Sequence, residues 1–375
     1  MSGIYVHFPF CKQKCVYCGF YSVASMRRKA DYWDALCKEI ELRKDYLPNN
    51  HIDTLYFGGG TPSLFSPEEL SHIIEQIHRF YTWDDSLEFT MEANPEQLTM
   101  SYLHSLKLLG INRLSIGVQS FDDDILHLLN RRHSAEEARK AVENAAAVGF
   151  DNVSIDLIYD IAFRTAEQWR SELSQALSLP ISHLSCYSLT VEENTLLARR
   201  VREGQPYLPD EADTERDFQI LTEMTQAAGF EQYEISNFSK NGAISKHNFS
   251  YWTGEPYLGL GAAAHSFRPP VRQWNIADIQ QYINGIQNEK PNVESEHLSI
   301  EQQYDEYVLL RLRTCLGINM KEVGERFGAA CLDMLQRQLK NVNPQHYEIQ
   351  NEIIRLTQHG RLFADAVAAE LFAAE

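Results

Sequence analysis

Short apolar runs alternate with stretches of helically spaced apolar residues through the first half of the chain. The runs predict strands over residues 4–8, 53–57, 87–92, 113–118, 152–159 and 183–189. The stretches between them predict helices over residues 29–44, 67–80, 99–109, 135–148 and 166–178. Because this alternation is typical of βα units, we predict an α/β fold, a partial (β/α)6 barrel of the TIM type over residues 1–190. An open doubly wound sheet is the alternative, since strand order cannot be read from the sequence.

The second half of the chain is less regular. Residues 191–295 contain a helical pattern at 211–228, an apolar-aromatic run at 233–238 and a glycine-rich stretch at 258–264. Polar residues and a proline gather near residues 290–300 and predict a domain boundary. Beyond it, residues 296–375 predict a small α+β domain of the winged-helix type, with helices at 301–314, 331–340 and 361–373 and alternating residues at 347–356.

Composition narrows the functional classes. Among 375 residues, 34 Lys and Arg stand against 52 Asp and Glu, a formal net charge of −18. Nucleic-acid-binding proteins usually carry an excess of Lys and Arg, which this chain lacks, so we predict no nucleic-acid partner. The first ten residues lack the pattern of a signal peptide and no apolar run predicts a transmembrane helix, and the scattered cysteines fit a reducing compartment. We therefore expect a cytoplasmic monomer or dimer, which is compatible with transient contact with membrane proteins.

Three closely spaced cysteines carry the strongest chemical signal. Cys11, Cys15 and Cys18 have the spacing C-x3-C-x2-C directly after the first predicted strand. Cysteine thiolates hold four-iron clusters, usually four of them, so three would leave one iron open. The alternative is zinc, which prefers a closed tetrahedral site and would need His7 or a distant residue as fourth ligand. The ligand count favours a 4Fe–4S cluster with an open iron.

Polar residues and glycines follow the other predicted strands where those strands end. In parallel βα architectures the carboxyl ends of the strands meet at one rim, where ligands bind. Taken singly, each segment has a structural explanation, such as a turn for the glycines or an ion pair for a carboxylate. Their convergence predicts a ligand site beside the cysteines. The segments are Gly58-Gly59-Gly60-Thr61-Pro62, Glu92-Ala93-Asn94-Pro95, Gln119-Ser120-Phe121 and Asp156.

The cysteine loop resembles that of the radical S-adenosylmethionine (SAM) superfamily. In that superfamily the open iron chelates SAM, and the reduced cluster cleaves it to a 5′-deoxyadenosyl radical. The resemblance implies that the glycines contact the SAM amino group and that Arg131 holds its carboxylate. It further implies that Glu92 and Asp156 bind the ribose hydroxyls and the ammonium group. The implied SAM-contacting residues are Tyr5, Tyr17, Gly58, Gly59, Gly60, Thr61, Glu92, Gln119, Arg131 and Asp156.

A series of collinear motifs is similar to one branch of that superfamily, the HemN/HemW group. This group contains the oxygen-independent coproporphyrinogen III dehydrogenases and the HemW heme chaperones. The dehydrogenases carry a further cysteine where this chain has Phe20, and a longer segment before the cluster. Both departures, and the motif HNFSYW, favour the heme-chaperone branch. The motifs include HFPFCKQKCVYC, YFGGGTPS, EANPE, RLSIGVQSF, LNRRH, YEISNF and YLGLGAAAHSF.

In that branch the histidine of the HNFSYW motif is implicated in heme binding. Imidazole is a common heme ligand, and aromatic rings can lie against a porphyrin face. The resemblance therefore makes His247, Tyr251 and Trp252 heme candidates, with His265 as a second histidine. A hydrogen-bonded turn is the structural explanation for the His-Asn pair.

The resulting hypothesis is a heme chaperone that carries heme as cargo to haemoprotein clients, with a cluster and SAM as cofactors. A coproporphyrinogen III dehydrogenase and a radical SAM enzyme acting on tRNA are the alternatives, and SAM turnover is left open.

One segment beside the predicted SAM site departs from the sequence pattern of the group. The group has Gly-Leu-Pro-Gly-Gln-Thr, whereas this chain has Asp160-Ile161-Ala162-Phe163-Arg164-Thr165. The departure changes backbone freedom and adds bulk there.

Overall fold

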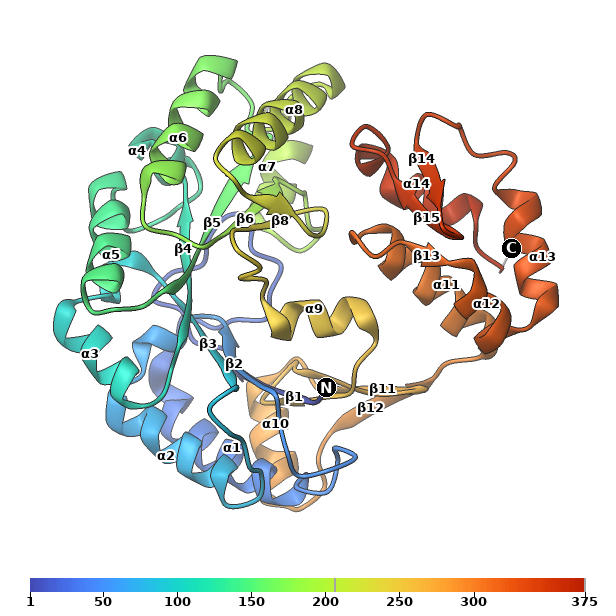
Figure 1. Ribbon diagram of the computed structural model, residues 1–375. Helices are drawn as coiled ribbons and strands as arrows, with labels where there is room; N and C mark the ends of the chain where they lie inside the picture. Colours follow the sequence, from blue (N-terminus) through green and yellow to red (C-terminus); the bar gives the residue numbers. More distant parts are fainter. Residues whose placement is uncertain (206, 374–375) are drawn as a thin grey trace.

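The computed structural model describes residues 1–205 and 207–373 and contains one large sheet and one small sheet (Figure 1). Seven neighbouring strands of the large sheet run parallel, in the order β9-β1-β2-β3-β4-β5-β6. Antiparallel strands extend both edges of this sheet. They are β1 (Gly3–Phe8), β2 (Thr54–Gly59), β3 (Glu88–Ala93), β4 (Arg113–Gln119), β5 (Asn152–Tyr159), β6 (His183–Ser188), β7 (Glu231–Gln232), β8 (Asn237–Ser239), β9 (Tyr257–Leu260), β10 (His265–Arg268), β11 (Val271–Asn275) and β12 (Val293–His297).

Helices follow the parallel strands and cover the outside of the sheet, as Figure 1 shows. The predicted α/β fold with a partial barrel is therefore confirmed, and the six predicted strands agree with β1 to β6 within two residues at each end. The helices are α1 (Lys29–Leu42), α2 (Pro67–His78), α3 (Met100–Leu108), α4 (Asp123–Leu128), α5 (Ala135–Ala147), α6 (Ala166–Ser178), α7 (Leu196–Arg202), α8 (Glu211–Ala227), α9 (Lys246–Thr253) and α10 (Ile279–Gln287).

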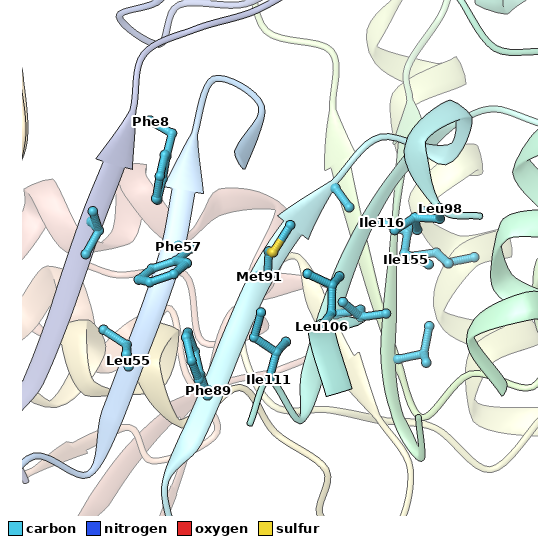
Figure 2. Packing of buried hydrophobic residues seen from close by; sticks show 14 of the residues in the cluster. Phe8, Leu55, Phe57, Phe89, Met91, Leu98, Leu106, Ile111, Ile116 and Ile155 are labelled. Carbon is cyan, nitrogen blue, oxygen red and sulfur yellow. The ribbon is translucent and has the colours of Figure 1, made fainter. Parts of the chain in front are cut away.

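The parallel strands have an apolar face and a polar face. On the apolar face, which is turned toward the helices, the ring of Phe57 packs edge to face against the rings of Phe8 and Phe89 (Figure 2). The centroids of these neighbouring rings lie 5.2 and 4.9 Å apart. The opposite face lines the barrel interior with polar side chains such as Glu92 and Asp156. This alternation of period two fixes the register and places the polar residues inside the barrel.

Residues 191–295 contain more regular structure than their sequence pattern suggests. The HNFSYW segment forms helix α9, which Ser245 caps and Gly254 terminates with a left-handed backbone. Its aromatic and β-branched residues are modest helix formers. Backbone N–H groups at the start of α9 donate to the carboxylate of Glu88, so tertiary contacts stabilise this helix.

A second hydrophobic core lies in the C-terminal region, in keeping with the predicted small α+β domain. The predicted helix 361–373 is divided: a 3-10 turn, Gly360–Phe363, precedes α14, because Gly360 packs directly against the His346 carbonyl. The predicted division at 1–190, 191–295 and 296–375 stays a prediction, of which residues 206 and 374–375 lie outside the described residues. The elements here are α11 (Ile300–Leu312), β13 (Ile318–Asn319), α12 (Met320–Phe327), α13 (Ala329–Gln338), β14 (Tyr347–Gln350), β15 (Ile353–Leu356) and α14 (Ala364–Glu370).

A short antiparallel bridge joins the C-terminal region to the barrel. The N–H of Ile235 donates to the Arg313 carbonyl at 3.0 Å, and the N–H of Cys315 donates to the Tyr233 carbonyl at 2.9 Å. The cation of Arg313 also lies over the ring of Trp252, 5.7 Å from its centroid.

Among the residues the structure describes, none of the helices has the length and apolar character needed to cross a membrane.

Candidate functional site

The cysteine loop leaves the carboxyl end of β1, at the predicted ligand-binding rim. Cys11, Cys15 and Cys18 are partly exposed, and none forms a disulfide. Within residues 1–205 and 207–373, no three His, Cys, Asp or Glu side chains are arranged to share one metal ion. The choice between a cluster and zinc therefore rests on the ligand count, since three thiolates leave one iron of a four-iron cluster open. Burial raises the pKa of the Cys11 and Cys18 thiols, so cluster binding has to displace their protons.

His7, the nearby histidine that a zinc site would use, is hydrogen-bonded at both ring nitrogens. Its Nδ1 lies 3.0 Å from the Tyr5 hydroxyl, and its Nε2 lies 2.9 Å from the Tyr21 carbonyl oxygen. Burial lowers the pKa of His7 to about 4, which keeps the ring neutral. The ring ties β1 to the end of the cysteine loop and is not aimed at the thiols.

Arg131 connects the cysteine loop with β3 and β4. Its Nη1 lies 3.4 Å from Cys15 Sγ, and its Nη2 donates to Asn94 Oδ1 and to the Gly117 carbonyl, both at 2.7 Å. Its Nε is buried and has no partner in the part of the chain that the structure describes. The guanidinium is therefore fixed beside the thiols, with its Nε–H unpaired. Asn94, which orients it, belongs to the segment that the sequence placed at the rim, but no role for its side chain was predicted.

Glu92 lies at the end of β3 beside the glycine segment. Its carboxylate accepts hydrogen bonds from the Tyr56 hydroxyl at 2.8 Å and from the Gly59 N–H at 2.9 Å. Burial raises the pKa of Glu92 to about 7, although these two hydrogen bonds act in the opposite direction. Gly59 has a φ of 106°, and a Cβ there would lie 2.4 Å from the His7 ring, so only glycine fits. The glycine segment thus also serves close packing between β1 and β2.

Asp156 and Gln119 lie on the next two strands of this rim. The Asp156 carboxylate accepts a hydrogen bond from the Ser115 hydroxyl at 3.2 Å, and burial raises its pKa. Gln119 has a φ of 69° at the end of β4, where the register against β5 shifts. A left-handed backbone at a residue other than glycine is uncommon and concentrates at functional sites. No local sequence pattern indicates this irregularity.

The predicted tyrosines lie on two sides of this site. Tyr5 lies in the interior, with its ring centroid 5.8 Å from that of Tyr56. Tyr17 packs against a small apolar cluster that includes Ile158 and Leu189 under the segment that follows β6. Thr61 reaches the cysteines directly, since its hydroxyl donates to Cys11 Sγ at 3.5 Å. Of the predicted residues, Thr61 and Arg131 thus contact the cysteines, whereas Glu92, Gln119 and Asp156 lie at or near the ends of neighbouring strands.

His247 lies at the other end of the barrel, against the amino ends of β1, β2 and β3. Its Nδ1 lies 2.7 Å from Thr54 Oγ1, and its Nε2 lies 2.7 Å from the Tyr251 hydroxyl. Burial and, to a smaller extent, the charge of Arg113 lower the pKa of His247 to about 3. The N–H groups of Lys246 and His247 donate to the Glu88 carboxylate at 2.8 and 2.9 Å. Helix α9 therefore lies against the amino ends of these strands. Both ring nitrogens of His247 are hydrogen-bonded, so neither is free for another ligand in this conformation.

The other heme candidates do not gather around His247. Trp252 packs under Arg313 of the C-terminal region. His265 is exposed on β10 and stacks on Trp274 of β11, with ring centroids 5.9 Å apart. Only His247 and Tyr251 contact each other.

The segment that departs from the group's pattern keeps a glycine-like backbone. Asp160 and Phe163, at the two positions where the group has glycine, have φ values of 60° and 71°. Arg164 is buried beneath them, 3.3 Å from Glu172 and with its cation 4.2 Å from the centroid of the Trp169 ring. Of the two bulky residues, Arg164 is thus a buried anchor, whereas Phe163 points to the solvent.

Comparisons with known proteins agree with this geometry. The model of the radical SAM superfamily matches residues 5–171, and that of the HemN C-terminal domain matches residues 298–363. The heme chaperone HemW of Bacillus subtilis is 34% identical over 373 residues, 98% of either chain. The chain belongs to the HemW family. The HemW of Escherichia coli is 31% identical over 378 residues, 100% of this chain and 98% of its own.

Membership of the HemW family confirms the branch that the sequence favoured. A solved structure, the coproporphyrinogen III oxidase HemN of Escherichia coli, described as a radical SAM enzyme, shares the fold of this HemW-family chain. Its TM-score is 0.87 at 22% identity, over 99% of this chain and 90% of that one. The radical SAM family implies a 4Fe–4S cluster and SAM.

Proposed function

We propose that this chain is a heme chaperone, which binds heme and passes it to haemoproteins, with a 4Fe–4S cluster and SAM at the barrel rim. The observation that carries the proposal is its similarity, over the full length, to proteins named heme chaperone HemW. The missing fourth cysteine at Phe20 supports the same choice over coproporphyrinogen dehydrogenation.

In this proposal the cysteine loop holds the cluster and the adjacent rim holds SAM. Cys11, Cys15 and Cys18 supply three thiolates, and a bound cluster supplies an open iron and an electron for SAM cleavage. The spare donor of Arg131 suits the SAM carboxylate, because a guanidinium pairs with carboxylates. Glu92 and Asp156 supply acceptors for the ammonium group and the ribose hydroxyls.

Anaerobic reconstitution with iron and sulfide tests the cluster. We expect about four irons per chain, and loss of the cluster absorption in Cys15→Ala. Cys37→Ala is the matched control, since Cys37 is also partly exposed and lies outside the loop. A Cys15→Ala variant that retains a full cluster would contradict the assignment.

Transfer of heme to an apo-haemoprotein tests the chaperone itself. The protein is loaded with hemin, mixed with apomyoglobin as a generic acceptor, and followed by the Soret band of the acceptor. We expect transfer faster than from free hemin alone. Failure to bind hemin, together with formation of protoporphyrinogen from coproporphyrinogen III and SAM, would replace the proposal by the dehydrogenase.

A further inference from the structure

The side-chain amide of Asn94 lies between two side chains that contact the cysteine loop. Its Oδ1 accepts from Nη2 of Arg131 at 2.7 Å, and its Nδ2 donates to Oγ1 of Thr61 at 3.3 Å. The Thr61 hydroxyl in turn donates to Cys11 Sγ at 3.5 Å. Nη1 of Arg131 lies 3.4 Å from Cys15 Sγ. One amide thus contacts the donors of two different cysteine sulfurs.

The chemistry of the two partners fixes which way round this amide lies. A guanidinium only donates hydrogen bonds, so the oxygen of Asn94 has to face Arg131 and its nitrogen has to face Thr61. A threonine hydroxyl has one proton, and because Thr61 accepts from the amide nitrogen, that proton is left for Cys11. The amide therefore directs a neutral donor to one sulfur and a cationic donor to the other.

The side chain of Asn94 does not serve the turn in which it lies. Asn94 precedes the 3-10 helix Pro95–Gln97, and asparagine at such a position commonly caps its own helix. Here the side chain makes no capping hydrogen bond. Its hydrogen bonds go instead to Thr61, which follows β2, and to Arg131, which follows α4. The contacts of this amide therefore concern the surroundings of the cysteines rather than local helix formation.

We propose that Asn94 is a positioning residue that sets the reduction potential of the bound cluster through Thr61 and Arg131. The inference rests on the proposed function and concerns the cluster site within it. A hydrogen bond to a cysteine sulfur stabilises the added negative charge of the reduced cluster, so each donor raises the potential. Without Asn94, Thr61 loses the donor that orients its hydroxyl, and Nη2 of Arg131 keeps only the Gly117 carbonyl. The cluster then becomes harder to reduce.

A redox titration of the reconstituted protein, in which dithionite supplies one electron per cluster, tests the proposal. We expect Asn94→Ala and Thr61→Val each to lower the equilibrium constant for reduction at least about threefold, which is about 28 mV for one electron. Because Asn94 acts partly through Thr61, the double variant shifts the potential by less than the sum of the two single shifts. Thr90→Val is the matched control and leaves the potential unchanged. Thr90 is also buried, on β3, and its hydroxyl has no hydrogen-bond partner within the described part of the chain.

The outcomes separate this inference from the proposed function. Full clusters with the wild-type potential in both single variants would overturn the role of Asn94 and leave the cluster assignment intact. An equal shift in Thr90→Val, or strictly additive shifts in the double variant, would overturn it as well. If Asn94→Ala holds no cluster, Thr61→Val decides: a lowered potential supports the role and an unchanged one overturns it. A wild-type protein that binds no cluster would remove the proposed function and the inference together.

Discussion

At the scale of single residues, Phe163 occupies a backbone conformation that suits glycine. Its φ is 71° and its side chain is 79% exposed. We expect Phe163→Gly to raise the free energy of unfolding by about 1 kcal/mol, because the left-handed strain disappears and few contacts are lost. Phe20→Gly is the control, since Phe20 is 70% exposed and lies outside the left-handed region. Thermal unfolding measures both, and equal effects would contradict the strain argument.

Glu92 gives the cluster-free protein a pH dependence of known sign. Its pKa is raised from 4.5 to about 7 in the fold, so the unfolded chain ionises first as pH rises. The contribution of Glu92 to the free energy of unfolding is therefore fully present below pH 4.5. It falls by up to about 3 kcal/mol as the pH rises to about 7. We expect the stability of Glu92→Gln relative to wild type to increase over this window. Exposed Glu41→Gln is the control, and a flat difference between Glu92→Gln and wild type would refute the shift.

At the scale of elements, helix α9 depends on one carboxylate below it. Glu88 accepts both N–H groups at the start of the helix, so Glu88→Ala leaves them unpaired. We expect faster amide hydrogen exchange throughout α9, corresponding to about 1–3 kcal/mol of lost protection. Asp84→Ala, on the surface near the same end, is the control. Unchanged exchange would show that packing alone holds the helix.

Helix α9 also marks where prediction from the sequence stops. Strands β1 to β6 were predictable because their apolar residues are local and continuous. Ser245 and Gly254 are local signals for the two ends of α9, but the contact with Glu88, far away in the chain, cannot be read from any local pattern. The same limit applies to the site: the CxxxCxxC spacing identifies Cys11, Cys15 and Cys18 directly. The role of Asn94 in orienting Arg131, and the occupied nitrogens of His247, exist only in three dimensions.

At the scale of the whole molecule, a backbone bridge between Glu234 and Thr314 joins the barrel to the C-terminal region, and the N–H groups of Ile235 and Cys315 form its hydrogen bonds. Both N–H groups donate to backbone carbonyls across this junction. We expect the two amides to exchange with one common free energy across a denaturant series. Amides in α11 that exchange far more slowly than both would contradict this expectation and show that the junction opens first.

Helix α9 also limits the directions from which the cysteine loop can be reached. Thr54, His247 and Tyr251 form a chain of hydrogen bonds that ties this helix to the amino end of β2. The cysteine loop lies at the opposite, carboxyl end of the strands. A ligand of that loop is therefore expected to arrive and to leave at the same end of the barrel, so that its entry and its exit share one route.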